Sequence, residues 1–185
     1  MNATASRHFL PPVPQAKLTP VNEATAPTSL KVHVRPARTE DVPRVAELFD
    51  QYCMFYGQPS RRRQAEAFIG DRVAKGDSAI FVAEAEEGIA GFVQLYPSIS
   101  SLSMGPIWVL NDLFVSPESR VRGVGAALLD HAHRMAEETG AAHMTLATAR
   151  DNRVAIDFYT RMGWQADEAY IHMYFPVKDR EPPQG

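Results

Sequence analysis

The sequence lacks a second cysteine, because Cys53 is the only one in its 185 residues. An intramolecular disulfide is therefore excluded, which favours a reducing compartment. No signature of a cysteine protease surrounds Cys53, and we interpret it as a packing residue. The chain also lacks an apolar run that approaches the roughly 20 residues needed to span a bilayer. We expect a soluble, cytoplasmic protein with no membrane partner.

Two further kinds of chemistry are poorly supported by the composition. The net charge of −3 provides no excess of positive charge for general nucleic-acid binding. His131 and His133 are two residues apart on a predicted helix, so their side chains point about 200° apart and do not share a metal ion. His143 and His172 lie in predicted strands without partners at metal-site spacing. We therefore expect neither a nucleic-acid partner nor a metal site.

What the chain does contain is enough apolar material for one domain. Hydrophobic residues make up 45% of the sequence, which at this length supports a single core. Residues 1–29 are rich in Pro, Ala and Thr without an apolar period, and we interpret them as a flexible arm rather than a secretory signal. Residues 179–185 form a charged, Pro-rich tail. The folded domain is thus predicted over residues 30–178.

Hydrophobic periodicity predicts both strands and helices within this domain. Strands are expected at residues 30–35, 78–84, 89–96, 107–115, 143–148 and 169–177. One helix should begin after an N-cap at Thr39, the next should reach Lys75, and two later helices should end at Gly140 and Gly163. Pro97 should end its strand, and residues 98–105 should form a loop of small residues.

The most informative stretch follows the predicted strand at 107–115. A turn at Ser116-Pro117-Glu118 leads into Arg120-x-x-Gly123-x-Gly125 and then into an apolar helical stripe. A helix N-terminus presents unpaired backbone N–H groups and partial positive charge, and glycine lets an anion approach closely. The pattern therefore predicts a diphosphate-binding cradle that consists of Arg120, Val121, Arg122, Gly123, Val124, Gly125 and Ala126.

The spacing of this cradle excludes two common phosphate-binding motifs. Leu128 stands where G-x-G-x-x-G has its third glycine, and no Gly-Lys-Ser/Thr follows. Downstream, the chain reads Asn152-x-x-Ala-x-x-Phe-Tyr-x-x-x-Gly-Trp164. Together and in this order, the two segments resemble the acetyl-CoA motif and the second motif of the GNAT N-acetyltransferase superfamily. The resemblance covers roughly residues 32–177.

This resemblance implies a fold and an acyl donor. The fold would be α/β, with a mixed, mostly antiparallel, twisted sheet of about seven strands, splayed at the acetyl-CoA site and flanked by about four helices. The donor would be acetyl-CoA, and its pantetheine arm would pair with the backbone of Leu113, Phe114 and Val115. The resemblance also allows a homodimer, because many relatives dimerise.

The second motif supplies two further candidate residues. Asn152 matches the family's asparagine that hydrogen-bonds the cofactor; it also fits a helix N-cap, and both roles are compatible. Tyr159 matches the tyrosine that lies near the cofactor sulfur. A phenol with a pKa of about 10 can protonate a departing thiolate, so Tyr159 is predicted to be the general acid. The alternative for Tyr159 is a buried aromatic on the core face of its helix.

Asn111 and Asp112 are the candidates for handling the proton of the acceptor amine. Diamine acetyltransferases carry Glu-Asp at the place that these two residues resemble, but Asn111 cannot take a proton. Asp112 is predicted to act through water or to bind the ammonium group, and Asn111 to contact substrate or water. Strand alternation points their side chains to opposite faces unless a bulge intervenes. Tyr96 and Glu84 are weaker candidates for the base.

The acceptor is predicted to meet an aromatic wall. Tyr52, Phe55 and Tyr56 cluster at the end of a predicted helix, where they serve either helix packing or a cation–π surface for an amine. We assign substrate binding to Tyr52, Tyr56, Tyr96 and Asp112.

The sequence thus predicts an acetyl-CoA-dependent N-acetyltransferase. The run from Leu95-Tyr96-Pro97 to Leu110-Asn111-Asp112 resembles the branch of the family that acetylates polyamines, amino acids or histone-like lysines. The acceptor would therefore be a primary amine, with a small amine, a polyamine or an amino acid favoured. It would attack directly in a ternary complex, because no activated nucleophile for a covalent intermediate is visible. The alternatives are a non-catalytic acyl-CoA-binding module, which would not need Tyr159, and a protein-lysine or aminoacyl-tRNA acetyltransferase, the latter using Arg61-Arg62-Arg63.

Overall fold

The computed structural model describes residues 32–120, 123–173 and 175. Short 3-10 helices lie at Thr39–Asp41 and Pro117–Ser119. The predicted arm at 1–29 and the predicted tail at 179–185 lie outside the described residues. The longer elements run in the order β1 (His33–Pro36), α1 (Val42–Phe55), α2 (Arg62–Lys75), β2 (Ala79–Ala85), β3 (Gly88–Ser100), β4 (Gly105–Val115), α3 (Val124–Glu138), β5 (Met144–Leu146) and α4 (Arg153–Arg161).

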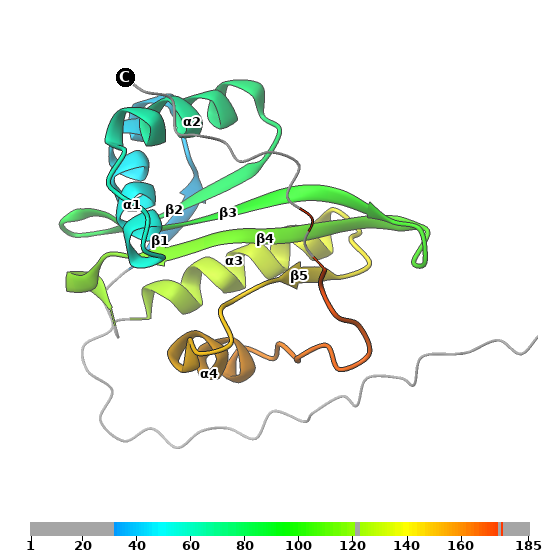
Figure 1. Ribbon diagram of the computed structural model, residues 1–185. Helices are drawn as coiled ribbons and strands as arrows, with labels where there is room; N and C mark the ends of the chain where they lie inside the picture. Colours follow the sequence, from blue (N-terminus) through cyan, green and yellow to red (C-terminus); the bar gives the residue numbers. More distant parts are fainter. Residues whose placement is uncertain (1–31, 121–122, 174, 176–185) are drawn as a thin grey trace, which may run out of the picture.

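The strands form one mixed sheet in the order β1-β2-β3-β4-β5. The neighbours from β1 to β4 are antiparallel, whereas β5 runs parallel to β4. Helices α1 and α2 lie over one face of the sheet, and α3 lies against the other face with α4 beyond it (Figure 1). The predicted α/β class, with a mostly antiparallel sheet and four helices, is confirmed.

The described sheet has five strands rather than about seven. The predicted strand at 169–177 lies partly outside the described residues, and residues 169–173 form no ladder with another strand. The side chains of Tyr170, Ile171 and Met173 are exposed. An alternating sequence becomes a strand only when its backbone N–H and C=O groups find a ladder partner, so the pattern alone overestimated the sheet.

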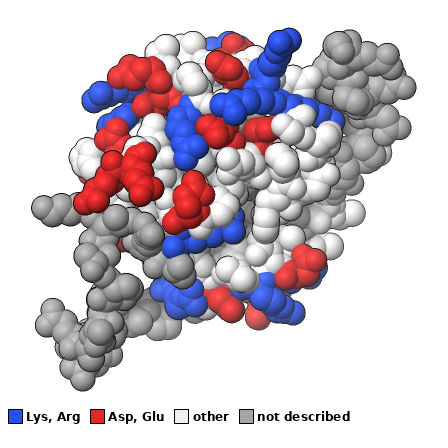
Figure 2. Space-filling model, turned by 90° about the vertical axis from the view of Figure 1, so that its left-hand side faces the viewer, with Lys and Arg blue, Asp and Glu red and all other residues white. Residues whose placement is uncertain are grey.

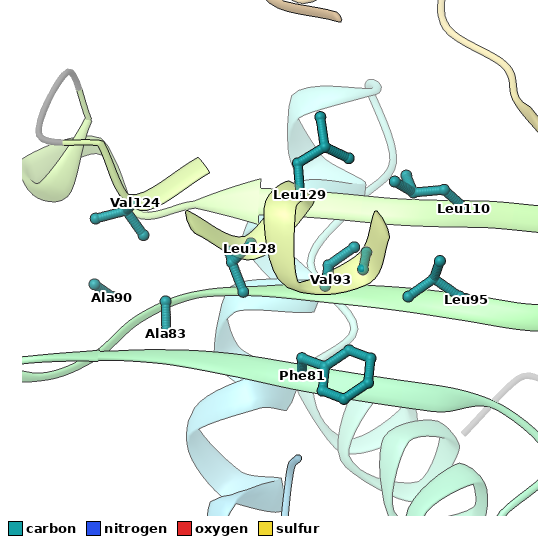
Figure 3. Packing of buried hydrophobic residues seen from close by; sticks show 10 residues of the cluster. Phe81, Ala83, Ala90, Val93, Leu95, Leu110, Val124, Leu128 and Leu129 are labelled. Carbon is teal, nitrogen blue, oxygen red and sulfur yellow. The ribbon is translucent and has the colours of Figure 1, made fainter. Parts of the chain in front are cut away.

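Each face of the sheet carries its own apolar core. On one face, Val124, Leu128 and Leu129 of α3 pack against side chains from β2, β3 and β4 (Figure 3). On the other face, Val45 and Leu48 of α1 and residues of α2 pack against the same three strands. Burial on both faces explains why residues 79–83 of β2 and residues 89–93 of β3 are apolar throughout rather than alternating.

The prediction that Pro97 ends a strand was wrong, because β3 continues to Ser100. From Tyr96 onward β3 pairs only with β4, since the ladder with β2 ends at the Ala79–Leu95 pair. Pro97 therefore lies on a half of β3 with one open edge, where a missing N–H breaks no ladder bond. The predicted loop at 98–105 is reduced to a four-residue turn at 101–104, with Met104 at a φ of 50°.

The start of the first helix also differs from the prediction. Thr39 begins a 3-10 turn, and α1 starts at Val42. The carboxylate of Asp41 accepts a hydrogen bond from the backbone N–H of Arg38 at 2.7 Å and pairs with Arg35 at 2.6 Å. The guanidinium of Arg35 lowers the pKa of Asp41, which keeps this buried carboxylate ionised.

Candidate active site

The sheet opens between β4 and β5. These two strands pair only where Trp108, Val109 and Leu110 meet Met144, Thr145 and Leu146. Beyond Leu110, β4 continues to Val115, whereas the chain after β5 turns away toward α4 (Figure 1). The edge of β4 at residues 113–115 is therefore not paired with β5, as the predicted splay requires, and its backbone groups are available to a ligand that extends like a strand.

The N-terminus of α3 lies beside this open edge. Gly123 precedes α3 with a φ of 81°, a left-handed conformation that glycine adopts without strain. The first helical bond runs from the N–H of Ala127 to the carbonyl of Gly123 at 3.0 Å. Helix geometry leaves the N–H groups of Val124, Gly125 and Ala126 without an acceptor inside α3. These donors are the expected diphosphate site.

The charged residues of the predicted cradle are only partly described. Val121 and Arg122 lie outside the described residues. The Arg120 side chain donates to the carbonyl of Val115 at 3.3 Å, and its guanidinium lies 5.7 Å from the ring centroid of Phe114. These two contacts hold Arg120 at the junction of the β4 edge and the α3 N-terminus.

A cavity of about 610 Å³ joins these features. It is lined by the predicted cradle residues Arg120, Gly123, Val124, Gly125 and Ala126, by the β4 residues Asn111, Leu113, Phe114 and Val115, by Asn152 and Tyr159, and by Tyr52 and Tyr56. Residues from both predicted motifs and from the aromatic wall thus line one space. Its volume falls in the range of small-molecule sites.

Asn152 and Tyr159 enter this cavity from opposite ends of α4. The side-chain oxygen of Asn152 accepts a hydrogen bond from the N–H of Ala155 at 3.2 Å, so Asn152 is the N-cap of α4, and its amide N–H₂ group donates to no other described residue. Burial, with smaller effects of Tyr56 and Asp112, raises the pKa of Tyr159 to about 12. The phenol is therefore protonated at neutral pH, as a general acid must be.

A β-bulge decides where Asn111 and Asp112 point. Gln94 pairs with Asp112 and Leu95 pairs with Leu110, so Asn111 is an extra residue in β4. Asn111 lines the cavity, whereas Asp112 is only 4% exposed and is absent from the lining. Asp112 lies on the α1 face, where burial raises its pKa and hydrogen bonds with Asn111 and Tyr52 oppose that rise.

The aromatic wall is present at the end of α1. Tyr52 and Tyr56 pack edge to face with ring centroids 5.1 Å apart, and Phe55 contacts Tyr56 in the same way. Phe55 lines the cavity and is 59% exposed.

Two weaker candidates lie away from the cavity. Tyr96 is absent from the lining, and its hydroxyl accepts a hydrogen bond from the buried amide of Gln94 at 3.0 Å. Glu84 is also absent from the lining and pairs with Arg35.

Sequence reasoning missed several lining residues. Ala147 and Thr148 follow β5, and Arg161 ends α4. Arg161 stands three residues after Phe158, which also lines the cavity, so helical spacing could have predicted that both side chains lie on the same face of α4.

Charge on the surface is mixed rather than uniform. Figure 2 shows positive and negative side chains interspersed on one face of the molecule. Ion pairs among the described residues include Arg44–Glu47 at 3.2 Å and Arg62–Glu47 at 3.5 Å. In the part of the chain that the structure describes, no helix is long and apolar enough to cross a bilayer, and no cluster of three metal-ligating side chains occurs.

Comparison with known proteins supports what the geometry indicates. Residues 43–164 match the Acetyltransferase (GNAT) family. The chain is 42% identical over 141 residues to an uncharacterized N-acetyltransferase, YhfO, of Bacillus subtilis, covering 76% of this chain and 95% of that one. It is 28% identical over 101 residues to the D-amino-acid N-acetyltransferase HPA3 of Saccharomyces cerevisiae, covering 55% and 62%. The crystal structure of a probable acetyltransferase superimposes with a TM-score of 0.75 at 38% identity, covering 80% of this chain and 99% of that one.

The fold and the site define an enzyme of the N-acetyltransferase class. The chain belongs to the GNAT family. The superfamily predicted from the two motifs is confirmed, and the polyamine, histone or amino-acid branch remains a prediction.

Proposed function

We propose that this enzyme transfers the acetyl group of acetyl-CoA to a primary amine by direct attack within a ternary complex. The observation that carries this proposal is the single cavity that joins the α3 N-terminus, the open edge of β4 and the phenol of Tyr159. A diphosphate, an extended amide-bearing arm and a thiolate leaving group need those three features in that order.

The donor would lie along the cavity with each part against a matching group. The diphosphate would accept hydrogen bonds from the N–H groups at the start of α3, where Arg120 adds a full positive charge. The pantetheine arm would pair with the backbone of Leu113–Val115, and the free amide of Asn152 would donate to it. This places the thioester in the gap between β4 and α4.

Transfer then requires a neutral amine and a protonated leaving group. The amine nitrogen attacks the thioester carbonyl, and the C–S bond breaks as the new C–N bond is retained. The departing thiolate takes the proton of Tyr159, and the phenolate then takes the extra proton that the attacking nitrogen acquired its positive charge with, which leaves a neutral amide and CoA as a thiol. The overall reaction turns an ammonium ion and acetyl-CoA into an acetamide, CoA and one released proton.

Charge in the cavity favours an acceptor with a single ammonium group. Arg120 is assigned to the diphosphate, so among the described lining residues Arg161 is the charged side chain left to the acceptor, and no described carboxylate lines the cavity directly. A polyamine would bring further positive charges toward Arg161, whereas the carboxylate of an amino acid would be attracted to it. The yeast relative's name, a D-amino-acid N-acetyltransferase, agrees with this choice. We therefore propose a small monoamine, with amino acids preferred.

The activity test follows release of the CoA thiol with a panel of acceptors. Amino acids of both configurations, simple monoamines, spermidine, a lysine peptide and aminoacyl-tRNA would be compared at saturating acetyl-CoA. We expect amino acids and monoamines to exceed spermidine by at least about tenfold in kcat/KM, a difference of roughly 1.4 kcal/mol. If acetyl-CoA binds but no acceptor raises thiol release above the background rate, the non-catalytic binding module is the correct function.

Replacement of Gly125 with alanine tests the diphosphate site. The added Cβ would meet the ring of Phe158 at 3.4 Å, an ordinary contact, and alanine favours a helix over glycine by about 1 kcal/mol. We expect unchanged or higher thermal stability, but a loss of acetyl-CoA affinity of about tenfold or more by calorimetry, because the methyl group would separate the diphosphate from the N–H groups.

Gly70 provides the matched control for this substitution. It lies inside α2, where an added Cβ would meet only Val42 at 3.7 Å. Gly70→Ala should raise stability by a similar amount and leave acetyl-CoA affinity unchanged. Equal affinities in both variants would place the diphosphate elsewhere.

A further inference from the structure

Three aspartates are buried in the described residues, and they differ in their partners. Asp41 pairs with the guanidinium of Arg35. Asp50 accepts hydrogen bonds from the Ser60 hydroxyl and the Arg61 backbone N–H, both at 2.6 Å, and so holds the start of α2. Both partnerships explain why a carboxylate stands there, since each compensates the cost of burial.

Asp112 is the least well compensated of the three. Like Asp50 it belongs to no ion pair among the described residues, but Asp50 accepts two hydrogen bonds of 2.6 Å. The carboxylate of Asp112 accepts one hydrogen bond, from the Asn111 amide at 3.3 Å. A buried carboxylate with so little compensation destabilises the folded state, so its presence needs a reason other than stability.

Tyr52 connects this buried carboxylate to the cavity. Its ring lines the cavity, and its hydroxyl donates to the backbone carbonyl of Asn111 at 3.3 Å. The hydroxyl also lies close enough to Asp112 for each of the two groups to shift the pKa of the other. Because a hydroxyl proton rotates about its C–O bond, it can point at either acceptor while the oxygen accepts a proton from the cavity side.

We propose that Tyr52 relays the proton of the acceptor ammonium to Asp112. The ammonium nitrogen gives one proton to the hydroxyl oxygen of Tyr52, and the original hydroxyl proton passes to the carboxylate of Asp112. The products are a neutral amine, a neutral Tyr52 and a protonated Asp112, so charge and atoms balance. Asp112 later returns its proton to solvent by the reverse path after the acetylated amine has left. The relay rests on the proposed acetyl transfer to an amine.

The groups that face the relay do not compete with it near neutral pH. They are Cys53 and Tyr56 from α1, Tyr96 from β3 and Tyr159 from α4. Burial raises the pKa values of Cys53, Tyr96 and Tyr159, so these three stay protonated. Burial also raises the pKa of Tyr52, so it passes protons on rather than ionising.

The test compares kcat against pH for the full chain, Tyr52→Phe, Asp112→Asn and the double variant, with the best amine from the acceptor panel. At pH 7.5 we expect each single variant to lose about 10²-fold or more in kcat. The double variant should be no more than about threefold slower than the slower single variant, because both changes interrupt one path. The losses should shrink toward pH 10, where an amine with a pKa of about 10.4 supplies its own neutral form.

Two measurements and a control variant distinguish loss of the relay from damage to the structure. Thermal unfolding and acetyl-CoA affinity should be preserved in Tyr52→Phe. Tyr170→Phe, which removes the same hydroxyl from a 67% exposed residue outside the cavity, should keep full activity.

The relay is overturned if Tyr52→Phe retains kcat within about threefold at pH 7.5. It is equally overturned if its loss is the same at every pH, or if the two single losses multiply in the double variant. Failure of the acetyl-transfer proposal looks different, because then the unaltered enzyme acetylates no amine while it still binds acetyl-CoA.

Discussion

Tyr159→Phe should lower kcat by about 10² to 10⁴-fold, the usual contribution of a positioned general acid. The substitution removes only the hydroxyl, which forms no hydrogen bond with another described residue, so the ring packing against Phe158 and Trp164 should survive. Acetyl-CoA affinity and melting temperature are therefore expected to stay unchanged. Stopped-flow or steady-state thiol release, combined with calorimetric titration, checks all three quantities.

The pH dependence provides a second check on Tyr159. Since its pKa is raised to about 12, the phenol remains protonated throughout the range in which the enzyme is folded and assayed. Unaltered enzyme should show no loss of kcat from ionisation of this group below about pH 11. A kcat for Tyr159→Phe within threefold of the unaltered enzyme would assign Tyr159 to packing, the alternative that its place on α4 also permits.

Asp112→Asn should separate activity from stability. We expect kcat to fall by about 10² to 10⁴-fold with the best amine, while the melting temperature at pH 7 rises. Burial raises the pKa of Asp112 above its ordinary value of 3.8, so the folded state binds this proton more tightly than the unfolded chain does. The free energy of unfolding therefore falls as the pH rises from the ordinary pKa of 3.8 through the raised pKa of the folded state, and it stays lower at neutral pH. The asparagine variant has no ionisation and does not carry this loss.

Asp41→Asn is the matched control, because the opposite change in melting temperature is expected for it. Arg35 lowers the pKa of Asp41, so its ionised form stabilises the folded state above the ordinary pKa. Loss of that charge leaves Arg35 with fewer partners, and the melting temperature at pH 7 should fall. Calorimetric scans of both variants decide the matter. A lower melting temperature for Asp112→Asn as well would show that Asp112 holds the structure together rather than serving the reaction.

The contrast between these residues shows how far sequence reasoning reached. The glycine turn and helix start at Gly123–Ala126 and the N-cap at Asn152 were predictable, because a helix N-terminus and a glycine conformation are local properties. The position of Asp112 was not, because the bulge at Asn111 depends on the register between β3 and β4. A register is set by packing across the whole sheet, and no short segment contains it.

The length of β3 illustrates the same limit. Pro97 is a strand breaker by its own chemistry, yet it lies within β3 because β2 ends opposite Leu95 and leaves that edge open. Conversely, residues 169–173 alternate as a strand should and form none, because no neighbouring strand pairs with them.

The sequence by itself determined the family, the glycine-rich helix start that is predicted to bind a diphosphate, and the residue types available for acid–base chemistry. The tertiary structure alone decided the open edge of β4, the burial of Asp112 and the contact of the Tyr52 hydroxyl with Asn111 across 59 residues of chain. The reason is physical: hydrogen bonding within a helix or turn acts between neighbours in sequence, whereas burial and proton paths depend on which distant elements pack together.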